Sequence, residues 1–399
     1  MGVDKTQEEI VLENKPELLN EYKFIYKDTE YDCTEYAKSN KHPGGLNFLN
    51  LFIDEKQDLT EYFRTLHSKQ ALKILKSFPK TGAKQEETES SKRFSILKKK
   101  LKHLFEPNWP IEIGLFLTTF TLFVTGCLTQ KWYFSIPLLV LMQIISGWIG
   151  HSMNHNRNPI LRKFALVYAP LCGGFSNKWW GRKHNQIFWF CEEKSHILML
   201  QYNDVTDKYY HTIPQQQIIF KIIQNQLIQF QQKHHMFTNN ILKDEDIQHD
   251  YKLWQFPFLF LKWKLDSILA SYYEFEGIFL ALHWVLLFNQ NFYIVILSEL
   301  IAGFFSASIL VGNHENEMKF ERRITLPFFE HQIAASRNYA FHDIFSLLIM
   351  GGMQYQTEHH FFPQIPFYRL PKARVIIAEE LKKWNLKIHE GPIFEKSHL

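Results

Sequence analysis

Four long apolar runs constrain the fold of this 399-residue chain more than any other feature. They form two pairs, Ile113–Leu128 with Tyr133–Ile149 and Gly277–Phe288 with Phe292–Val311, each pair joined by a few polar residues. At about 1.5 Å per residue, helices of this length cross most of a bilayer core roughly 30 Å thick. The third run is short, and we expect it to extend back toward Tyr272. The sequence therefore predicts two membrane-spanning helical hairpins, the alternative being buried helices of a large soluble protein.

The composition further limits the class of protein to which the chain can belong. Aromatic residues are frequent, with 36 Phe, 17 Tyr and 10 Trp, which fits lipid-facing helices whose ends carry Trp109 and Trp132 at the membrane interfaces. We expect Glu299, the acidic residue of the fourth run, to face the interior of the helical bundle. The net charge of +4 forms no basic stripe and argues against a nucleic-acid partner. Four scattered cysteines predict reduced thiols, and the charged stretch Met1–Lys15 predicts no cleavable signal peptide.

A compact soluble segment near the N-terminus carries two histidines in favourable positions. Pro43, Gly44 and Gly45 would hold His42 on a rigid corner, because proline fixes one backbone angle and glycine permits a tight turn. His67 follows further along, and helical pieces between the two histidines could bring both to one cavity. Two imidazoles on opposite faces of a porphyrin make a six-coordinate iron, which transfers electrons because it has no open position.

A linker and a helix are expected before the first apolar run. Lys84–Lys92 is polar and lacks apolar anchors, so the sequence predicts a flexible linker there. Phe94–Phe105 alternates apolar residues with lysines, which predicts a basic amphipathic helix at the cytosolic face of the membrane. Both hairpins would return the chain to this same face, so all of its chemical groups would lie on one side.

Histidines gather where the apolar runs end. His151 and His155 follow the first hairpin at the i, i+4 spacing that puts two imidazoles on one face of a helix. Imidazole nitrogens suit iron, copper or zinc, and helical bundles build di-iron sites from side chains on several helices. The other candidates near the ends of apolar or aromatic stretches are His184, His314, Gln356, His359 and His360. Together these residues predict a metal centre.

The N-terminal segment, roughly residues 22–82, resembles a cytochrome-b5-like heme-binding domain. The residues that carry the resemblance are Tyr31-Asp32, His42 to Gly45, Asp58 to Thr60, Phe63 and His67-Ser68. The resemblance implies a bound heme b with His42 and His67 as the two axial ligands.

The remainder resembles the membrane fatty-acid desaturases, and within them the front-end group, which has a fused b5-like domain and a third histidine box that begins with Gln. The matching stretches are His151–His155, Phe175–Asn185, Asn203–Pro214 and Gln354–Pro371. The resemblance implies a multidomain chain, with a small α+β heme domain and an all-α four-span membrane bundle whose cytosolic cap surrounds two non-heme irons. The implied iron ligands are His151, His155, His184, His314, His359 and His360, and Gln356 stands where other desaturases have a histidine.

The same resemblance implies a reaction and its partners. The reaction would be the oxygen-dependent insertion of a cis double bond between an existing double bond and the carboxyl end of an acyl-CoA or acyl-lipid substrate. Electrons would come from cytochrome b5 reductase through the fused heme. The protein would be multi-pass in the endoplasmic reticulum membrane, with both the catalytic and the heme faces cytosolic. We expect a flexible N-terminus (1–21), the heme domain (22–83), the linker and amphipathic helix (84–106) and the desaturase domain (107–399).

The second histidine box departs from the family pattern. Where His-x-x-His-His is expected, His184 is followed by Asn185, Gln186 and Ile187. Two expected histidines are thus absent. The stretch Ile187–Ser195 has the character of an insertion, and without it His196 would restore His-x-x-His but not the final histidine of the box. As the chain stands, His196 could act as a substitute ligand. Two alternatives to a desaturase therefore remain, namely a b5-fused fatty-acid hydroxylase and a non-catalytic membrane heme protein that only carries electrons.

Several polar residues outside the boxes have weaker claims. We expect His211, His331, His342 and the pair His234-His235 to be structural or at the surface. Gln332, Ser336 and Asn338 precede the third box and are expected to shape the site rather than to carry its chemistry.

Overall fold

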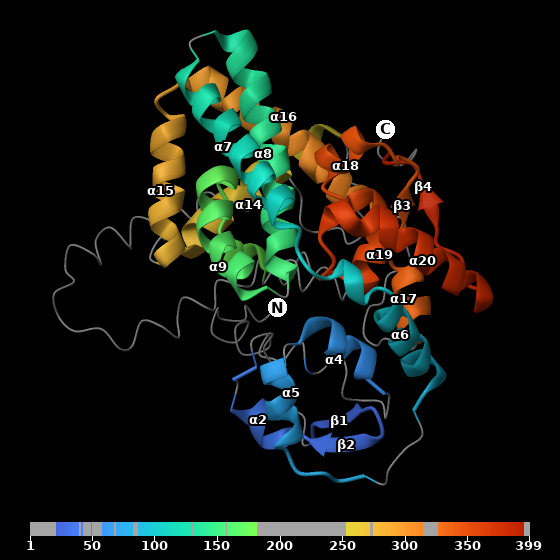
Figure 1. Ribbon diagram of the computed structural model, residues 1–399. Helices are drawn as coiled ribbons and strands as arrows, with labels where there is room; N and C mark the ends of the chain where they lie inside the picture. Colours follow the sequence, from blue (N-terminus) through green and yellow to red (C-terminus); the bar gives the residue numbers. More distant parts are fainter. Residues whose placement is uncertain are drawn as a thin grey trace, which may run out of the picture. The chain divides into compact units, whose positions relative to one another are not determined.

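The computed structural model describes residues 21–39, 41–42, 49, 58–67, 69–82, 87–129, 131–156, 158–181, 253–271, 274–313 and 326–394. The chain divides into two compact units (Figure 1), one made of Met1–Lys100 with Arg322–His331 and the other of Leu101–Glu321 with Gln332–Leu399.

The first unit is a small α+β structure. Its strands β1 (Lys23–Tyr26) and β2 (Thr29–Asp32) pair in an antiparallel hairpin. Its helices are α2 (Thr34–Lys38), α4 (Thr60–Leu66), α5 (Lys69–Lys76) and α6 (Glu89–Lys100). Buried aromatic side chains of the hairpin, among them Tyr26 and Tyr31, form a core with Phe63 of α4 and Leu75 of α5. This core supports the segment between α4 and α5 that carries His67.

Helix α6 corrects two expectations. It begins at Glu89, so the last residues of the expected flexible linker are helical. The hydroxyl of Thr88 accepts a hydrogen bond from the backbone N–H of Ser91 at 3.2 Å, which satisfies one of the unpaired donors at the helix start. The apolar side of α6 is buried within the first unit, where the ring centroid of Phe94 lies 5.5 Å from that of Phe328. Phe94 therefore packs against protein instead of facing lipid.

The second unit is built around long apolar helices. Among the described residues, three helices are long and apolar enough to cross a membrane. They correspond to α7 (Trp109–Leu128, preceded by the short η1, Lys102–Leu104), α8 (Trp132–His155) and α16 (Phe292–Gly312). Helix α15 (Phe275–Leu287) is apolar but has only 13 residues. At about 1.5 Å per residue it would cover roughly 20 Å, less than the hydrocarbon core of a bilayer.

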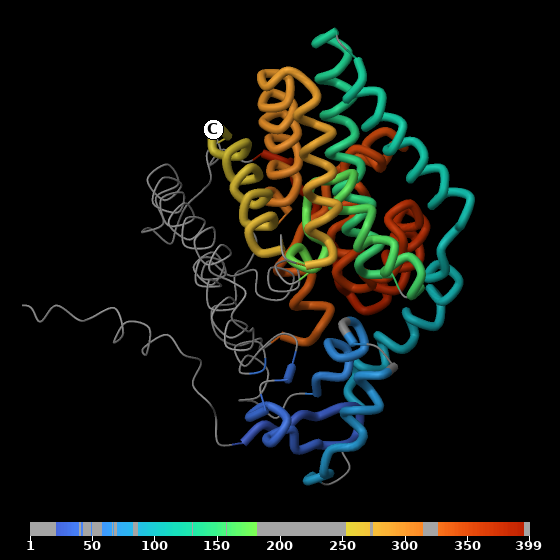
Figure 2. Tube along the Cα trace, turned by 90° about the vertical axis from the view of Figure 1, so that its left-hand side faces the viewer, coloured from blue at the N-terminus to red at the C-terminus, as the bar shows by residue number. Residues whose placement is uncertain are grey.

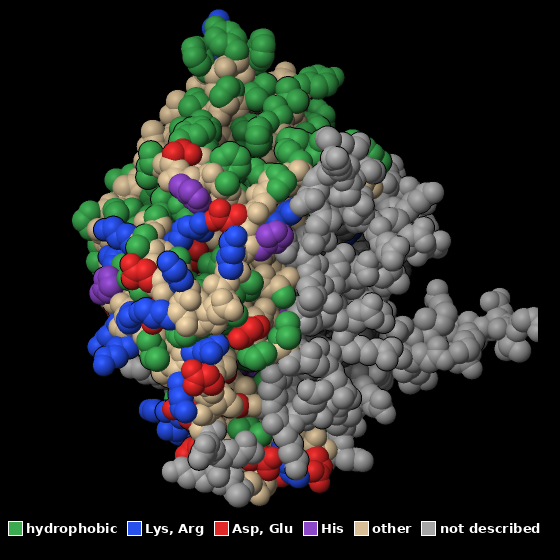
Figure 3. Space-filling view, turned by 90° about the vertical axis from the view of Figure 1, so that its right-hand side faces the viewer, with side chains coloured by type: hydrophobic (Ala, Val, Ile, Leu, Met, Phe, Trp, Pro, Cys, Tyr) green, Lys and Arg blue, Asp and Glu red, His purple; other side chains and the backbone are tan. Residues whose placement is uncertain are grey.

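These helices pack side by side. Helix α7 lies along α8, α8 along α16, and α16 along α14 (Phe256–Ser271), as Figures 1 and 2 show. At the top of Figure 3, the end of this bundle is covered by hydrophobic side chains. Trp109 and Trp132 are exposed, as interface residues would be, at 41 % and 64 %. Glu299 is buried inside the bundle, which confirms the expectation for this residue.

Shorter elements complete the second unit on either side of the bundle. They are α9 (Pro159–Tyr168), the π-helical turn η2 (Ala169–Gly173), η4 (Leu253–Gln255), α17 (Phe328–Ala334, shared with the first unit), α18 (Ile344–Met350), η5 (Met353–Tyr355), α19 (Gln356–Phe361), η6 (Phe367–Arg369) and α20 (Leu370–Lys383). Strands β3 (Asn338–Tyr339) and β4 (Glu390–Gly391) form a short parallel pair.

Two glycines bring α19 to the end of α8. Gly351 and Gly352 both adopt the left-handed conformation (φ +56° and +82°), which ends α18 and reverses the chain. A side chain at Gly351 has no room, since its Cβ would lie 2.1 Å from Cβ of Trp148 in α8. The indole N–H of Trp148 donates to the carbonyl oxygen of Ile349 at 2.8 Å. This close contact fixes the turn, and with it the histidines that follow, against α8.

Candidate metal centre and heme site

Three histidines from two distant parts of the second unit meet in one cluster. His151 and His155 lie on the last two turns of α8, and His359 lies on α19. One ring nitrogen from each lies within 4.8 Å of the other two. The ring centroids are 5.1 Å apart for His151 and His155, 4.9 Å for His151 and His359, and 5.3 Å for His155 and His359. Since metal–imidazole bonds are about 2 Å long, a small inward movement would let all three bind one ion.

His360 and Gln356 occupy the same short helix, one turn apart. The amide nitrogen Nε2 of Gln356 lies 3.0 Å from Nε2 of His360, as the i, i+4 spacing predicts. Nδ1 of His360 lies 2.8 Å from Oε1 of Gln332. Because the amide oxygen can only accept, this bond assigns the proton of His360 to Nδ1 and leaves a lone pair on Nε2. In this structure the amide nitrogen of Gln356 donates to that lone pair, so His360 can bind a metal only after the Gln356 side chain turns away.

The residues expected to shape the site hold α19 from the side. Asn338 accepts a hydrogen bond from the backbone N–H of Thr357 at 2.9 Å and donates to the carboxylate of Glu358 at 2.6 Å. Ser336 bonds the hydroxyl of Thr357 at 3.1 Å. Burial raises the pKa of Glu358, while its bonds with Asn338 and Arg374 act in the opposite direction. All three predicted residues, including Gln332, therefore make contacts that fix the third histidine box.

The other predicted ligands, His184, His196 and His314, lie outside the described residues, as do the second histidine box and the stretch Ile187–Ser195. His331 is buried and hydrogen-bonded to the hydroxyl of Tyr62 at 3.1 Å within the first unit, in agreement with a structural role. Burial lowers the pKa of His331 to about 3, so its imidazole is neutral at physiological pH.

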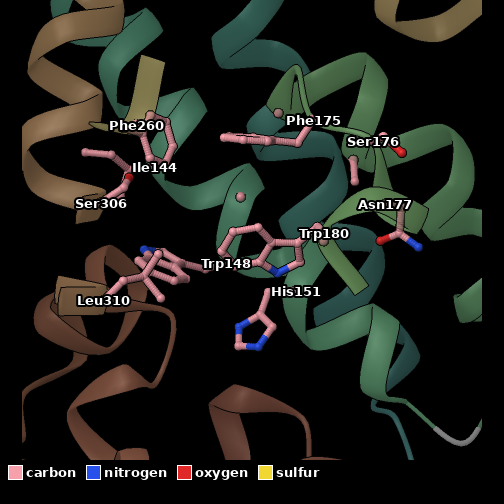
Figure 4. Close-up of a pocket in the computed structure, with 14 residues that line it drawn as sticks. Ile144, Trp148, His151, Phe175, Ser176, Asn177, Trp180, Phe260, Ser306 and Leu310 are labelled. Atoms are coloured by element: carbon pink, nitrogen blue, oxygen red, sulfur yellow. The ribbon is translucent and has the colours of Figure 1, made fainter. Parts of the chain in front are cut away.

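A largely apolar cavity opens beside His151 (Figure 4). Phe175 and Phe260 lie at one end of it, with ring centroids 5.0 Å apart, and Trp180 lies between Phe175 and His151, at 6.1 Å and 6.3 Å from them. The residues that line it are Ile144, Gly147, Trp148, Gly150, His151, Ala169, Gly173, Phe175, Ser176, Asn177, Trp180, Phe260, Ser306 and Leu310. An apolar cavity that reaches one of the clustered histidines fits a hydrocarbon substrate that is modified along its length.

The histidine pattern alone did not indicate this cavity. Trp180 belongs to a stretch that carried the resemblance, but nothing in its spacing showed which way its side chain points. Phe260 and Lys264 lie in a segment that received no role. The available signal was a charged residue within a largely apolar helix, since a charge that faces the interior requires a buried partner.

The first unit brings His42 and His67 together. Their ring centroids are 5.9 Å apart with the ring planes tilted by 45°, and the ring of Phe63 stacks on His67 at 4.3 Å. Burial lowers the pKa of His42, and burial and then the neighbouring His42 lower the pKa of His67 to about 4. Both imidazoles are therefore neutral at physiological pH, which is the form that a metal ligand requires. Their spacing suits one iron between them, at about 2 Å from a nitrogen of each ring.

The two units together indicate a class of protein, namely a membrane protein with clustered histidines beside an apolar cavity and a second histidine pair whose spacing suits a heme iron. Family comparison makes this specific. Residues 130–392 match the family described as fatty acid desaturase, and residues 6–84 match the cytochrome b5-like heme/steroid binding domain. The chain belongs to the fatty acid desaturase family. It is a membrane oxidoreductase that desaturates fatty acids, with a cytochrome b5-like domain at its N-terminus.

Its relatives among characterised proteins cover most of the chain at low identity. It is 26 % identical to the Delta(8)-fatty-acid desaturase of Euglena gracilis over 89 % of this chain and 90 % of that protein. It is 26 % identical to a Delta(6)-fatty-acid desaturase of Caenorhabditis elegans over 64 % of this chain and 60 % of that protein. It is 22 % identical to the acyl-lipid 8-desaturase of Rebecca salina over 91 % and 86 % of the two chains. No solved structure matches the chain.

Proposed function

We propose that this protein is a front-end acyl desaturase, which inserts a cis double bond between an existing double bond and the carboxyl end of its substrate. The observation that carries the proposal is the cluster of His151, His155 and His359, of which His151 lines an apolar cavity. The names of its relatives, which specify carbons 8 and 6, support attack near the carboxyl end. Its substrate would be an acyl-CoA or an acyl-lipid, and its oxidant molecular oxygen.

The proposed centre holds two irons. His151, His155 and His359 would bind iron together with His360, and His184 and His314 would complete the ligand set. His196 would substitute for a histidine missing from the second box. Bound iron supplies the oxygen activation that removing hydrogen from an unactivated methylene requires.

The protein's own residues would place the substrate and protect the site. The aromatic lining of the cavity would hold an apolar chain beside His151 and exclude water from it. Gln332, bonded to Nδ1 of His360, would orient that imidazole, and Gln356 would release Nε2 when iron binds.

The proposed membrane arrangement has four spans, with α15 as the short third span. A locally thinner bilayer would accommodate its length. The elements that follow α16 would form a cap on the cytosolic side. The protein would reside in the endoplasmic reticulum membrane. Residues 22–83 would form the heme domain, after a flexible stretch at 1–21. Residues 84–106 would connect it to the desaturase domain at 107–399. Cytochrome b5 reductase would reduce the heme, and the covalent link would keep this donor at high effective concentration.

The test is expression of the full chain in a desaturase-deficient host that is fed polyunsaturated fatty acids. Mass spectrometry of the lipids should show products lighter by two hydrogens, whereas a hydroxylase would add oxygen. Iron analysis of the purified protein should give about two irons beyond the heme iron. A chain that contains heme iron alone and forms no product is an electron carrier, and the proposal then fails. A variant lacking Ile187–Ser195 tests whether that stretch limits activity, which should then rise.

A further inference from the structure

A buried cluster of polar side chains lies deep in the helical bundle and has no place in the chemistry described above. The ammonium Nζ of Lys264 in α14 donates to both carboxylate oxygens of Glu299 in α16, at 2.7 Å and 3.0 Å. It also donates to Oε1 of Gln143 in α8, at 2.8 Å. Lys264 is completely buried, and Glu299 and Gln143 are 2 % and 3 % exposed. We call these three residues the buried ion-pair cluster.

The cluster lies directly behind the aromatic end of the cavity. Nζ of Lys264 is 5.7 Å from the ring centroid of Phe175 and 6.0 Å from that of Phe260. Both rings line the cavity (Figure 4). A cation at this distance from the face of an aromatic ring attracts it, particularly where water is excluded. Lys264 therefore helps to hold in place the two rings that form this wall.

The position of the cluster along each helix places it at the end of the cavity remote from the metal centre. On α8, the cavity runs from His151 back to Ile144, two helical turns or about 10 Å, and Gln143 comes next. On α14, Lys264 lies one turn beyond Phe260. On α16, Glu299 lies two turns before the lining residue Ser306. Three helices thus deliver a polar group at the point where the apolar lining stops.

We propose that the buried ion-pair cluster is the closed end of the acyl site and determines the longest chain that fits between it and the metal centre. This inference rests on the proposed function. A methyl end that reached the cluster would have to separate charged hydrogen-bonded groups without replacing their bonds. Misfit by one methylene in an apolar site changes specificity by about 10- to 200-fold. Lys264 and Glu299 are therefore specificity-determining residues that do not touch the reacting carbons.

The experiment changes both charges together, because removing one partner leaves the other charge buried and unpaired. The purified full chain carrying Lys264→Ala with Glu299→Ala is titrated with free fatty acids of increasing length, in competition with a fluorescent fatty acid. Wild type should show a length above which affinity falls at least tenfold, and the double variant should move that limit to longer chains by two carbons or more. A second double variant, Lys264→Met with Glu299→Leu, removes the charges but keeps most of the volume. Because apolar side chains can move aside without losing hydrogen bonds, it should also move the limit to longer chains, by less than the alanine variant does. It decides the question if the alanine variant does not fold.

The matched control is the neighbouring ion pair of α14, in which Nζ of Lys262 lies 3.1 Å from Asp266 and neither residue lines the cavity. Lys262→Ala with Asp266→Ala should leave the length limit unchanged. An unchanged limit in a folded variant of the buried pair overturns the inference, and so does an equal shift in the control. The titration measures binding and needs no turnover. A wild type that shows the chain-length limit but forms no new double bond therefore refutes the proposed function and leaves the inference standing. A wild type whose affinity shows no length limit overturns the inference and leaves the proposed function standing.

Discussion

The hydrogen bond between Gln332 and His360 gives the sharpest test of the metal centre. We predict that Gln332→Leu lowers iron content and desaturation, because His360 loses the group that fixes its tautomer. Both side chains are fully buried and their atoms are 2.8 Å apart, so no water can replace the amide oxygen without rearrangement. Leaving the Nδ1–H buried without an acceptor costs about 1–3 kcal/mol. At about 1.4 kcal/mol per factor of ten, this corresponds to roughly 5- to 150-fold, in line with the 10- to 100-fold typical of groups that support metal ligands.

The assay combines iron analysis of the purified full chain with the rate of product formation in the expression host. Gln332→Glu is the matched variant, since its carboxylate still accepts from Nδ1–H, and it should retain activity well above that of Gln332→Leu. Elution as a single species from a sizing column and a normal heme spectrum show that each variant is folded. Unchanged iron and activity in Gln332→Leu, or an equal loss in Gln332→Glu, would refute the role assigned to this bond.

His359→Ala should abolish desaturation and lower the non-heme iron while heme absorbance stays normal, whereas His67→Ala should remove heme absorbance and leave the non-heme iron. Gly351→Ala should reduce activity at least tenfold, since strain and the clash with α8 cost about 1–3 kcal/mol each; a wild-type rate contradicts this. Burial raises the pKa of Glu61 to about 7 from 4.5, so the folded state keeps a proton that the unfolded state releases, and stability falls as pH rises between these values. The loss between pH 5 and pH 8 is of the order of 2–3 kcal/mol, and Glu61→Gln should remove it. Urea unfolding followed by heme absorbance at the two pH values measures it, and equal pH dependence in both proteins would exclude this cause.

The spacing of residues along the sequence predicted the contacts between side chains of the same helix. His151 and His155 share a face of α8 because they are four residues apart, and Gln356 reaches His360 for the same reason. Local spacing could not bring His359 to His151, since that contact joins segments about 200 residues apart. It depends on how tightly Gly351 packs on Trp148, and helical periodicity carries no information about such a contact. Resemblance to a family supplied what the pattern could not.

The expectations that failed did so because local contacts outweighed composition. The stretch before α6 has the composition of a linker, but the cap provided by Thr88 starts a helix at Glu89. The lysine-rich side of that helix suggested a membrane surface, but Phe94 has protein partners in the first unit, and the cationic groups of Arg64 and Lys98 lie over its ring. An amphipathic helix shows that one face is buried, and the sequence does not say whether lipid or protein buries it.

The buried ion pair shows what can be inferred from a charged residue inside an apolar segment. Glu299 was expected to face inward because a carboxylate cannot face lipid at low cost, and the same reasoning requires a cationic partner on a neighbouring helix. Helix α14 offers two lysines, and their register separates them. Lys262 pairs with Asp266 one turn further along its own helix, which leaves Lys264 to meet Glu299. Once an inward charge is identified, its partner can thus be sought among the cations that have no partner within their own helix, and here that search leads to the end of the cavity.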